Sequence, residues 1–323
     1  MLVLGHRGCA CSPENTMKAF KQALDFGADG IEIDVQKTLD NVLVISHDEN
    51  LKRLTGMDLN IRKVNFQKLK GIRIQGEEVP KLGNVLEFIR DSDKFIDIEV
   101  KNAKDFKEVY NLVKDLRIKD YVISSFWHRD LFGLKLLYED VKIGFLYVHE
   151  PRAIELEMYF KDVDFLKPNY FYVTDEYKTY FRATIPWTVN DIEKAVYFKE
   201  RDTFGIITDF PDKIIEVLKG GSNNMINPYL SYFLQMIDKE TIQKGDNNIS
   251  FDVVNYIMPI NIEEINVEGG EVNIGRELPF LWNIGERLKF ELKLQGENPK
   301  INIRVREVGD VSFTLKDIQS SLI

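Results

Sequence analysis

Two hydrophobic patterns follow one another along the 323 residues. Up to about Lys219, short runs rich in β-branched and aromatic residues alternate with amphipathic stretches of helical period. The runs predict eight strands, at 2–6, 30–36, 95–101, 121–126, 142–148, 164–168, 183–189 and 204–209. Eight βα units predict an α/β protein with a closed (β/α)₈ barrel of the TIM type. An open doubly wound sheet is disfavoured, because its glycine-rich phosphate loop is missing from the sequence.

The pattern changes at residues 220–224 (GGSNN), whose composition is typical of a flexible linker. Beyond them, apolar residues recur at every second position, as in strands with one buried face. The alternation covers Leu288, Phe290, Leu292 and Leu294, and then Ile301, Ile303 and Val305. We therefore predict a barrel domain over 1–220 with an insertion at about 48–80, and an all-β, sandwich-like accessory domain over 221–323.

A hairpin is predicted after the strand that contains Asp34. Asp40 and Asn41 lie between this strand and a second apolar run, 42–47, so there is no room for a crossover helix. Asp-Asn suits a two-residue turn. With these two residues as the turn, Asp34 pairs with His47.

The composition narrows the class of protein. With 43 Lys and Arg against 52 Asp and Glu, the formal charge is −9, which disfavours binding to nucleic acid through a basic surface. No run approaches the ~18 apolar residues of a membrane span, and the apolar start of the chain is too short for a secretory leader. Cys9 and Cys11 are one residue apart, a spacing that we expect not to bridge. Together these features predict a cytoplasmic protein without a disulfide framework.

Acidic residues alternate with aliphatic ones on two predicted strands. In the run 31–35 (IEIDV), the period of two places Glu32 and Asp34 on one face, and Glu99 follows the same pattern on the strand 95–101. A barrel interior is normally lined by bulky apolar side chains, so carboxylates near the carboxyl ends of its strands indicate a bound cation. Ligands that are all oxygen favour a hard ion such as Mg²⁺ or Ca²⁺.

Two of the four histidines, His6 and His47, lie at the ends of predicted strands beside these acidic residues. A pair of imidazoles can exchange protons with an attacking and a leaving oxygen near neutral pH. Arg7 offers a fork that matches phosphate oxygens, and Lys101 offers a compact charge. For the other two histidines we expect structural roles.

Several short motifs contain these residues. They are GHRG (5–8), PENT (13–16), EID (32–34), SHD (46–48), EVK (99–101), WTVN (187–190) and GIITD (205–209). In this order they resemble the signature of the glycerophosphodiester phosphodiesterase family, over residues 2–218. The resemblance implies a (β/α)₈ barrel with a small insertion, and hydrolysis of a glycerophosphodiester to a glycerol phosphate and an alcohol.

The resemblance also implies a role for each site residue. His6 and His47 would be the acid–base pair, Glu32, Asp34 and Glu99 the metal ligands, and Arg7, Lys101, Asn15 and Trp187 the substrate contacts. The implied cofactor is one divalent cation, Mg²⁺, Ca²⁺ or Mn²⁺. The implied partner is a small-molecule glycerophosphodiester.

Three alternatives stay open. A related lipase-type phosphodiesterase, acting on lysophospholipids or phosphoinositides, would use a similar barrel, and a hydrophobic rim on the 48–80 insertion would favour it. A non-catalytic binding protein would work through the β domain, although the intact set of His and carboxylate residues argues against it. The β domain could also make the protein a homo-oligomer, because exposed strand edges can pair with another chain.

Overall fold

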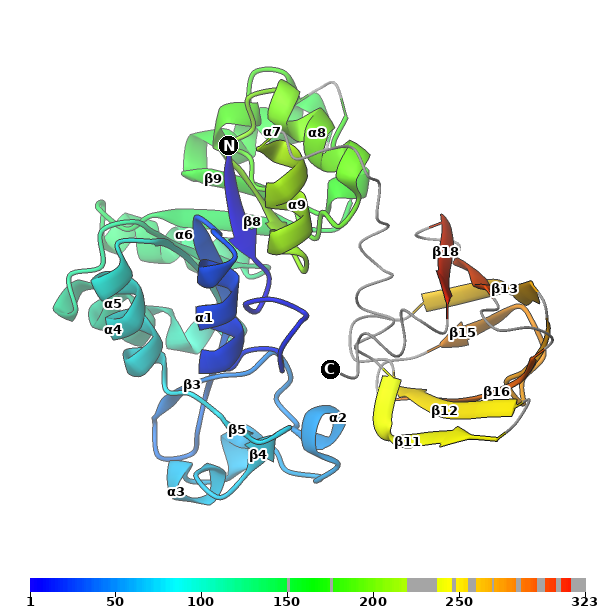
Figure 1. Ribbon diagram of the computed structural model, residues 1–323. Helices are drawn as coiled ribbons and strands as arrows, with labels where there is room; N and C mark the ends of the chain where they lie inside the picture. The colour runs from blue at the N-terminus through cyan, green and yellow to red at the C-terminus, as the bar shows by residue number, and fades with distance from the viewer. Residues whose placement is uncertain are drawn as a thin grey trace. The chain divides into compact units, whose positions relative to one another are not determined.

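The structure is a computed structural model that describes residues 1–149, 152–174, 177–219, 237–245, 248–254, 260–268, 270–282, 286–294, 300–305 and 309–314. The chain divides into two compact units, Met1–Ser222 and Asn223–Ile323. The predicted linker, 220–224, lies outside the described residues. Figure 1 shows helices and strands in the first unit, coloured blue to green, and strands in the second, coloured yellow to red.

Seven parallel strands form the curled sheet of the first unit, in the order β10-β1-β2-β6-β7-β8-β9. Their bounds are β1 Leu2–Gly5, β2 Gly30–Lys37, β6 Phe95–Val100, β7 Tyr121–Ser125, β8 Ile143–Tyr147, β9 Phe165–Pro168 and β10 Gly205–Thr208. The predicted TIM-type arrangement is thus found as a curled parallel sheet covered by helices.

The segment 184–189 connects the two edge strands of this sheet. The N–H of Ile185 donates to the carbonyl of Leu166 on β9 at 2.8 Å, and the N–H of Ile207 on β10 donates to the carbonyl of Pro186 at 3.0 Å. The sequence predicts a strand at 183–189, but the structure has isolated parallel bridges here instead. Pro186 explains the difference, because a proline has no N–H to donate to a strand ladder.

Helices lie on the outside of the sheet (Figure 1). They are α1 Met17–Asp25, α4 Leu82–Ser92, α5 Phe106–Asp115, α6 His128–Leu137, α7 Ala153–Asp162, α8 Ile192–Glu200 and α9 Pro211–Leu218. Their apolar faces and the outer face of the sheet form one large buried cluster. A separate inner cluster contains Leu4, Phe95, Val122, Ile185 and Ile207. The βα order therefore places the loops after the strands together at one end of the barrel.

The predicted hairpin is present, but its register differs by one residue. The strand β3 (Leu43–Ile45) pairs antiparallel with β2, and the N–H of Ser46 donates to the carbonyl of Asp34 at 2.9 Å. Asp34 therefore lies opposite Ser46 and not His47, so the predicted pairing is wrong. The turn contains three residues rather than two, and Asn41 adopts a positive φ of 62° that closes it.

The insertion after this hairpin folds around its own small core. Its elements are α2 Lys52–Thr55, the 3₁₀ turn Ile61–Lys63, α3 Phe66–Leu69, β4 Arg73–Ile74 and β5 Glu77–Glu78. Leu51, Ile61, Leu69, Ile72, Ile74 and Val79 are buried together with Val44 of β3. The stretch that shows no long element in the sequence is therefore an ordered lobe attached to β3.

In the second unit, the described residues form two antiparallel sheets of four strands each, β11-β12-β16-β14 and β15-β13-β17-β18. The strands are β11 Ile237–Lys244, β12 Asn248–Val254, β13 Ile260–Glu268, β14 Gly270–Asn273, β15 Phe280–Trp282, β16 Arg287–Leu294, β17 Lys300–Val305 and β18 Gly309–Thr314. One buried cluster draws residues from both sheets, including the stacked rings of Phe251 and Phe290. The predicted alternation at Leu288, Phe290 and Leu292 places all three inward.

Candidate active site

Three carboxylates meet on the neighbouring strands β2 and β6. Glu32, Asp34 and Glu99, which we call the carboxylate triad, each offer an oxygen within 4.8 Å of the others. Their strands pair in register, with Asp34 directly opposite Glu99, so the alternation seen in the sequence brings all three to one place. Glu32 and Asp34 are 3% and 1% exposed. An all-oxygen set in this arrangement could hold a divalent cation.

Two cations border the triad. Lys101 Nζ lies 2.6 Å from both Asp34 Oδ1 and Glu99 Oε1, and Arg7 Nε lies 3.1 Å from Asp34 Oδ2. Burial by itself would raise the pKa of Asp34, but the charges of Lys101 and Arg7 outweigh it and hold that pKa well below its ordinary value. Asp34 is therefore ionised and fixed in place.

Glu32 has the opposite electrostatic situation. Burial, together with the negative charges of Asp34 and Glu99, raises the pKa of Glu32 well above its ordinary value. The N–H of Arg7 donates to Glu32 Oε2 at 3.1 Å, which is a weaker compensation than a full positive charge. A divalent cation held by the triad would supply the missing charge, so these residues fit the predicted metal.

Each predicted acid–base histidine is bound to a carboxylate through the same ring nitrogen. His6 Nδ1 lies 2.6 Å from Asp209 Oδ1, at the end of β10, and Asn190 Nδ2 donates to the other oxygen of Asp209 at 2.6 Å. His6 Nε2 lies 4.0 Å from Glu32 Oε2, on the side of the triad. Burial would raise the pKa of Asp209, but the charge of His6 and their hydrogen bond outweigh it and lower that pKa.

His47 repeats this arrangement with a different carboxylate. Its Nδ1 lies 2.6 Å from Asp48 Oδ1, and Arg53 Nε donates to Asp48 Oδ2 at 2.5 Å. Arg53 also binds Glu14 through both terminal nitrogens, at 2.9 and 2.6 Å, and Glu14 accepts a further bond from Arg7 at 3.1 Å. One chain of ion pairs therefore runs from His47 through Arg53 and Glu14 to Arg7.

The two remaining substrate-contact residues predicted from the resemblance have different surroundings. Asn15 is fully buried: its Nδ2 donates to Asp34 Oδ2 at 2.8 Å, and the N–H of Asp34 donates to its Oδ1 at 3.3 Å. Trp187 Nε1 donates to the carbonyl of Lys167 at 2.8 Å, and its ring contacts Phe126 edge-on at 5.9 Å. Asn15 thus supports a triad carboxylate, whereas Trp187 lines the mouth of the barrel.

A buried ion pair lies next to the triad, in the layer of Glu32, because Asp97 is directly opposite Glu32 in the β2–β6 pairing. Asp97 precedes Glu99 by two residues on β6 and pairs with Lys167 of β9, and both side chains are fully buried. Ser124 joins them, since its Oγ donates to Asp97 at 2.7 Å and accepts from Lys167 Nζ at 2.9 Å. Gly144 leaves room for this lysine, because a Cβ there would come within 2.9 Å of Lys167 Cδ.

The loop between β1 and α1 corrects one prediction. Cys9 and Cys11 form a disulfide, with their Cα atoms 5.3 Å apart, although their spacing was expected not to bridge. The chain turns sharply here, with positive φ at Arg7 (50°) and Gly8 (95°), and this turn brings the two sulfur atoms together. The bridge lies inside the loop that carries His6 and Arg7 at one end and Asn15 at the other.

The other side of the barrel mouth is apolar. Phe126 and Trp127 follow β7, Val148 follows β8, and Phe171 and Tyr172 follow β9; we call these five residues the apolar rim. Their exposed fractions are 46%, 55%, 53%, 71% and 36%. In the 48–80 insertion, by contrast, Met57 is the one large hydrophobic residue exposed among those the structure describes. The insertion therefore lacks the hydrophobic rim that would favour a lipid substrate, and the exposed apolar side chains follow β7, β8 and β9 instead.

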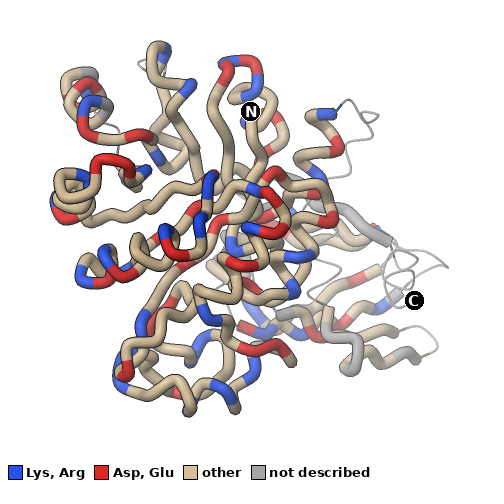
Figure 2. Tube along the Cα trace, turned by 90° about the vertical axis from the view of Figure 1, so that its left-hand side faces the viewer, with Lys and Arg blue, Asp and Glu red and all other residues tan. Residues whose placement is uncertain are grey.

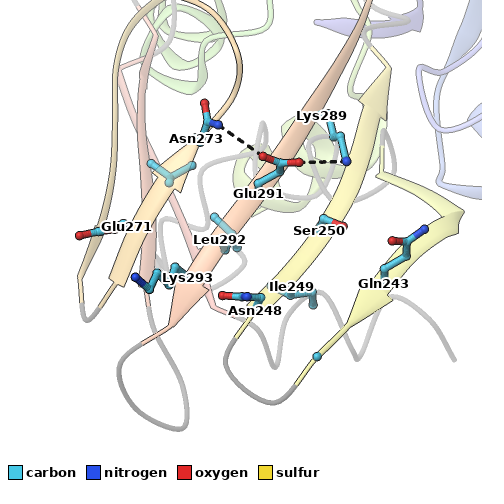
Figure 3. Close-up of a pocket in the computed structure, with 12 residues that line it drawn as sticks. Gln243, Asn248, Ile249, Ser250, Glu271, Asn273, Lys289, Glu291, Leu292 and Lys293 are labelled. Carbon is cyan, nitrogen blue, oxygen red and sulfur yellow. Dashed lines mark hydrogen bonds and ion pairs between the residues drawn. The ribbon is translucent and has the colours of Figure 1, made fainter.

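A groove of about 700 Å³ lies on one sheet of the second unit, lined by residues of β11, β12, β14 and β16 (Figure 3). Two of its charged groups bind each other, since Lys289 pairs with Glu291 at 2.9 Å, and Asn273 Nδ2 also donates to Glu291 at 3.3 Å. None of the predicted site residues lines it. The candidate chemistry is therefore at the barrel mouth.

Two further properties concern charge and membranes. Figure 2 shows acidic and basic residues interspersed along the trace, which agrees with an excess of only nine acidic residues. Within the described part of the chain, every helix is too short or too polar to cross a membrane.

Comparison with known proteins identifies the barrel. Residues 6–213 match the model of the glycerophosphoryl diester phosphodiesterase family. A glycerophosphodiester phosphodiesterase of Caldanaerobacter subterraneus is 34% identical over 242 residues, which is 68% of this chain and 98% of that protein. The chain belongs to the glycerophosphoryl diester phosphodiesterase family. It is therefore an enzyme, and the reaction is hydrolysis of glycerophosphodiesters, as the resemblance predicts.

Solved structures of the family agree. The glycerophosphodiester phosphodiesterase of Thermotoga maritima matches with a TM-score of 0.59 and 32% identity, over 67% of this chain and 98% of that one. A phosphodiesterase of Oleispira antarctica, solved in complex with the product sn-glycerol-3-phosphate, matches with a TM-score of 0.62 and 24% identity, over 68% of this chain and 97% of that one. Both matches cover about two thirds of the chain, a share similar to that of the first unit.

Sequence reasoning missed the partners of the two histidines in this phosphodiesterase. Asp48 and Asp209 both stand in the recognised motifs, but neither was given a role. Asp48 adjoins His47, so an acidic neighbour was a usable signal. Asp209 is 203 residues from His6, and only the adjacency of β1 and β10 in a closed barrel could have paired them.

Proposed function

We propose that this enzyme hydrolyses its glycerophosphodiester with His6 and His47 as the acid–base pair. The observation that supports this most directly is that both rings bind a carboxylate through Nδ1 at 2.6 Å and lie near the triad: His6 Nε2 is 4.0 Å from Glu32, and the charge of His47 contributes to the low pKa of Asp34. With Nδ1–H donating to the carboxylate, Nε2 is the nitrogen that exchanges a proton with substrate. One histidine accepts the proton of the attacking hydroxyl, and the other donates to the leaving alcohol.

We assign metal binding to Glu32, Asp34 and Glu99, with Mg²⁺, Ca²⁺ or Mn²⁺ as the ion. A divalent cation held there would supply positive charge for the phosphoryl oxygens and would lower the pKa of the attacking hydroxyl. Arg7 and Lys101, already next to the triad, hold the phosphate and share this electrostatic role. Asn15 positions Asp34, and Trp187 forms a wall of the glycerol pocket.

The test is release of glycerol phosphate by the full chain from glycerophosphocholine and glycerophosphoethanolamine, with and without EDTA. We expect release that EDTA abolishes and that Mg²⁺, Ca²⁺ or Mn²⁺ restores. Release that is unaffected by exhaustive chelation would contradict the assignment of the triad.

A second substrate class is favoured by the apolar rim. A lysophospholipid carries the same phosphodiester, with an acyl chain on the glycerol, and that chain could lie on Phe171 and its neighbours instead of in water. Hydrolysis of lysophosphatidylcholine, measured as choline release, distinguishes this class. The catalytic groups would be unchanged.

We also propose that the first unit is the catalytic domain, with the 48–80 lobe as its insertion, and that the second unit is an accessory β-sandwich. The shared apolar cluster of its two sheets supports the sandwich. Homo-oligomer formation through its strand edges stays a prediction, as does location in the cytoplasm. The Cys9–Cys11 bridge bears on the location, since disulfides in cytosolic proteins are usually redox-active rather than structural.

A further inference from the structure

We propose that the Cys9–Cys11 pair is a redox switch of the catalytic loop, with the disulfide form as the more active state. The inference rests on the proposed roles of His6 and Arg7. It concerns the nine-residue loop 7–15, which carries parts of the site at both ends. The reductant that such a switch requires is a dithiol, either a small molecule or a protein.

The loop is closed on itself at its base. The N–H of Asn15 donates to the carbonyl of Arg7 at 2.9 Å, so the first and last residues of the loop are held together. Both of these residues bind the same oxygen of Asp34, Arg7 through Nε at 3.1 Å and Asn15 through Nδ2 at 2.8 Å. Any change in the shape of the loop is therefore transmitted to a carboxylate of the triad.

The middle of the loop is hydrogen-bonded to Asp209, the residue whose carboxylate binds His6. Ala10, which lies between the two cysteines, donates its N–H to the carbonyl of Asp209 at 2.9 Å. The side chain of Asp209 accepts from His6 Nδ1. The disulfide forms a small ring around Ala10, and this ring restricts the backbone that makes the contact. The bridge thus stabilises both the position of Arg7 and the position of the carboxylate that orients His6.

The chemistry is thiol–disulfide exchange. A thiolate of the dithiol attacks Sγ of Cys11, the more accessible sulfur, because Cys9 is only 1% exposed. A mixed disulfide forms and Cys9 leaves as a thiolate. The second thiol of the reductant then closes its own disulfide and releases Cys11. Two electrons pass to the enzyme, and two protons end on the two cysteines, so the exchange is balanced and reversible.

Reduction removes the ring but leaves every catalytic side chain in the sequence. The loop then samples conformations in which Ala10 is away from Asp209 and Arg7 is away from Asp34. Loss of a cross-link over so short a loop corresponds to a modest entropic effect, so we expect kcat/KM to fall by ~3- to 10-fold rather than to vanish. Reoxidation should restore the original value.

The experiment compares the full chain with excess Mg²⁺ in two states, after oxidised glutathione and after tris(2-carboxyethyl)phosphine. Iodoacetamide labelling and intact mass verify each state. Because Cys9 and Cys11 are the only cysteines of the chain, labelling reports directly whether this disulfide is reduced. The control is the double variant Cys9→Ser/Cys11→Ser. This variant should have the kcat/KM of the reduced enzyme, and the reductant should not change that value.

Equal or higher rates in the verified reduced state would overturn the switch. So would failure of the two thiols to pair under oxidant, or a double variant as fast as the oxidised enzyme. If neither state releases glycerol phosphate, the proposed function itself fails and the switch fails with it. Hydrolysis that is present but indifferent to redox state rejects the switch alone.

Discussion

The two sides of the barrel mouth are built on different physical principles. At the neighbouring strands β10, β1, β2 and β6 and the loops that follow them, charged groups form one network of ion pairs, such as Lys101–Asp34 at 2.6 Å and Arg7–Asp34 at 3.1 Å. After β7, β8 and β9, the loops expose the apolar rim. The charged side has its geometry over-determined, since almost every group has two partners. The apolar side exposes apolar surface to solvent, although Phe126 contacts Trp187 and Phe171 stacks on Tyr170.

Under the proposed mechanism, this difference separates the chemistry of the enzyme from its recognition of the substrate. Phosphoryl chemistry needs charges held at set distances before substrate arrives, and only the charged side provides them. Recognition of an alcohol or acyl group needs surface that can lose water, and the apolar side provides that. Substitutions on the charged side should therefore change kcat, whereas substitutions on the apolar side should change KM for particular substrates.

The largest effect is expected from removal of a proton-transfer group. His6→Ala and His47→Ala should each leave folding intact and lower kcat by ~100-fold or more. The matched control is His149→Ala, an exposed histidine next to the apolar rim, which should retain wild-type turnover of glycerophosphoethanolamine. Near-normal turnover in either of the first two variants would remove that histidine from the mechanism.

A smaller loss is expected when a histidine keeps its place but loses its carboxylate. Asp209→Asn should lower kcat by ~10-fold, with KM little changed, because the ring of His6 is no longer held in one tautomer. Asp48→Asn should cost less, since its side chain is 26% exposed against 14% for Asp209, and water can replace it. A greater loss of kcat in Asp48→Asn than in Asp209→Asn would contradict this ranking of the two histidine–carboxylate pairs.

Sequence patterns indicated the groups that we propose as catalytic, but not the carboxylates that bind the two histidines. Alternation along β2 and β6 was enough to place Glu32, Asp34 and Glu99 on one face, because a strand has a period of two whatever its surroundings. The His6–Asp209 contact depends on closure of the barrel, which no local pattern encodes. The Cys9–Cys11 bridge depends on two consecutive positive φ angles in a loop, and its one-residue spacing suggested the reverse.

Hairpin register shows the same limit at smaller scale. The turn at Asp40-Asn41 was predicted correctly as a turn, yet its length was wrong by one residue, which moved His47 away from Asp34 along the ladder. The charge of His47 nevertheless helps to lower the pKa of Asp34, because the chain bends after β3 and keeps the ring near this carboxylate. Residue chemistry could be predicted from the sequence, whereas the path of the loops could not.

Metal binding should depend on pH through Glu32. Burial and its acidic neighbours raise the pKa of Glu32 in the metal-free protein, so at pH values between its ordinary and raised pKa the group holds a proton that metal must displace. Affinity for Mg²⁺ should therefore fall as pH decreases, by up to about tenfold per pH unit. Calorimetry in buffers of different ionisation enthalpy would detect the released proton. Affinity that is constant with pH, without proton release, would contradict a protonated Glu32.

The smallest effect is expected at the apolar rim. Phe171, which is 71% exposed and stacked on Tyr170, should contribute only through the apolar surface that it covers. If ~40 Å² of an acyl chain is buried on it, Phe171→Ser removes about 1 kcal/mol, or about a fivefold rise in KM for lysophosphatidylcholine. KM for glycerophosphoethanolamine, which has no such chain, should not change.

The control for this variant is Leu137→Ser. Leu137 is 74% exposed, as apolar as the rim residues, and ends α6, so it lies at the opposite end of the barrel from the mouth. It should alter neither KM. A rise in KM for both substrates in Phe171→Ser would mean that the rim shapes the phosphate site itself. If KM for lysophosphatidylcholine is unchanged in both Phe171→Ser and Leu137→Ser, the acyl chain does not contact the loop after β9. The apolar side of the mouth would then not be the side that recognises the substrate.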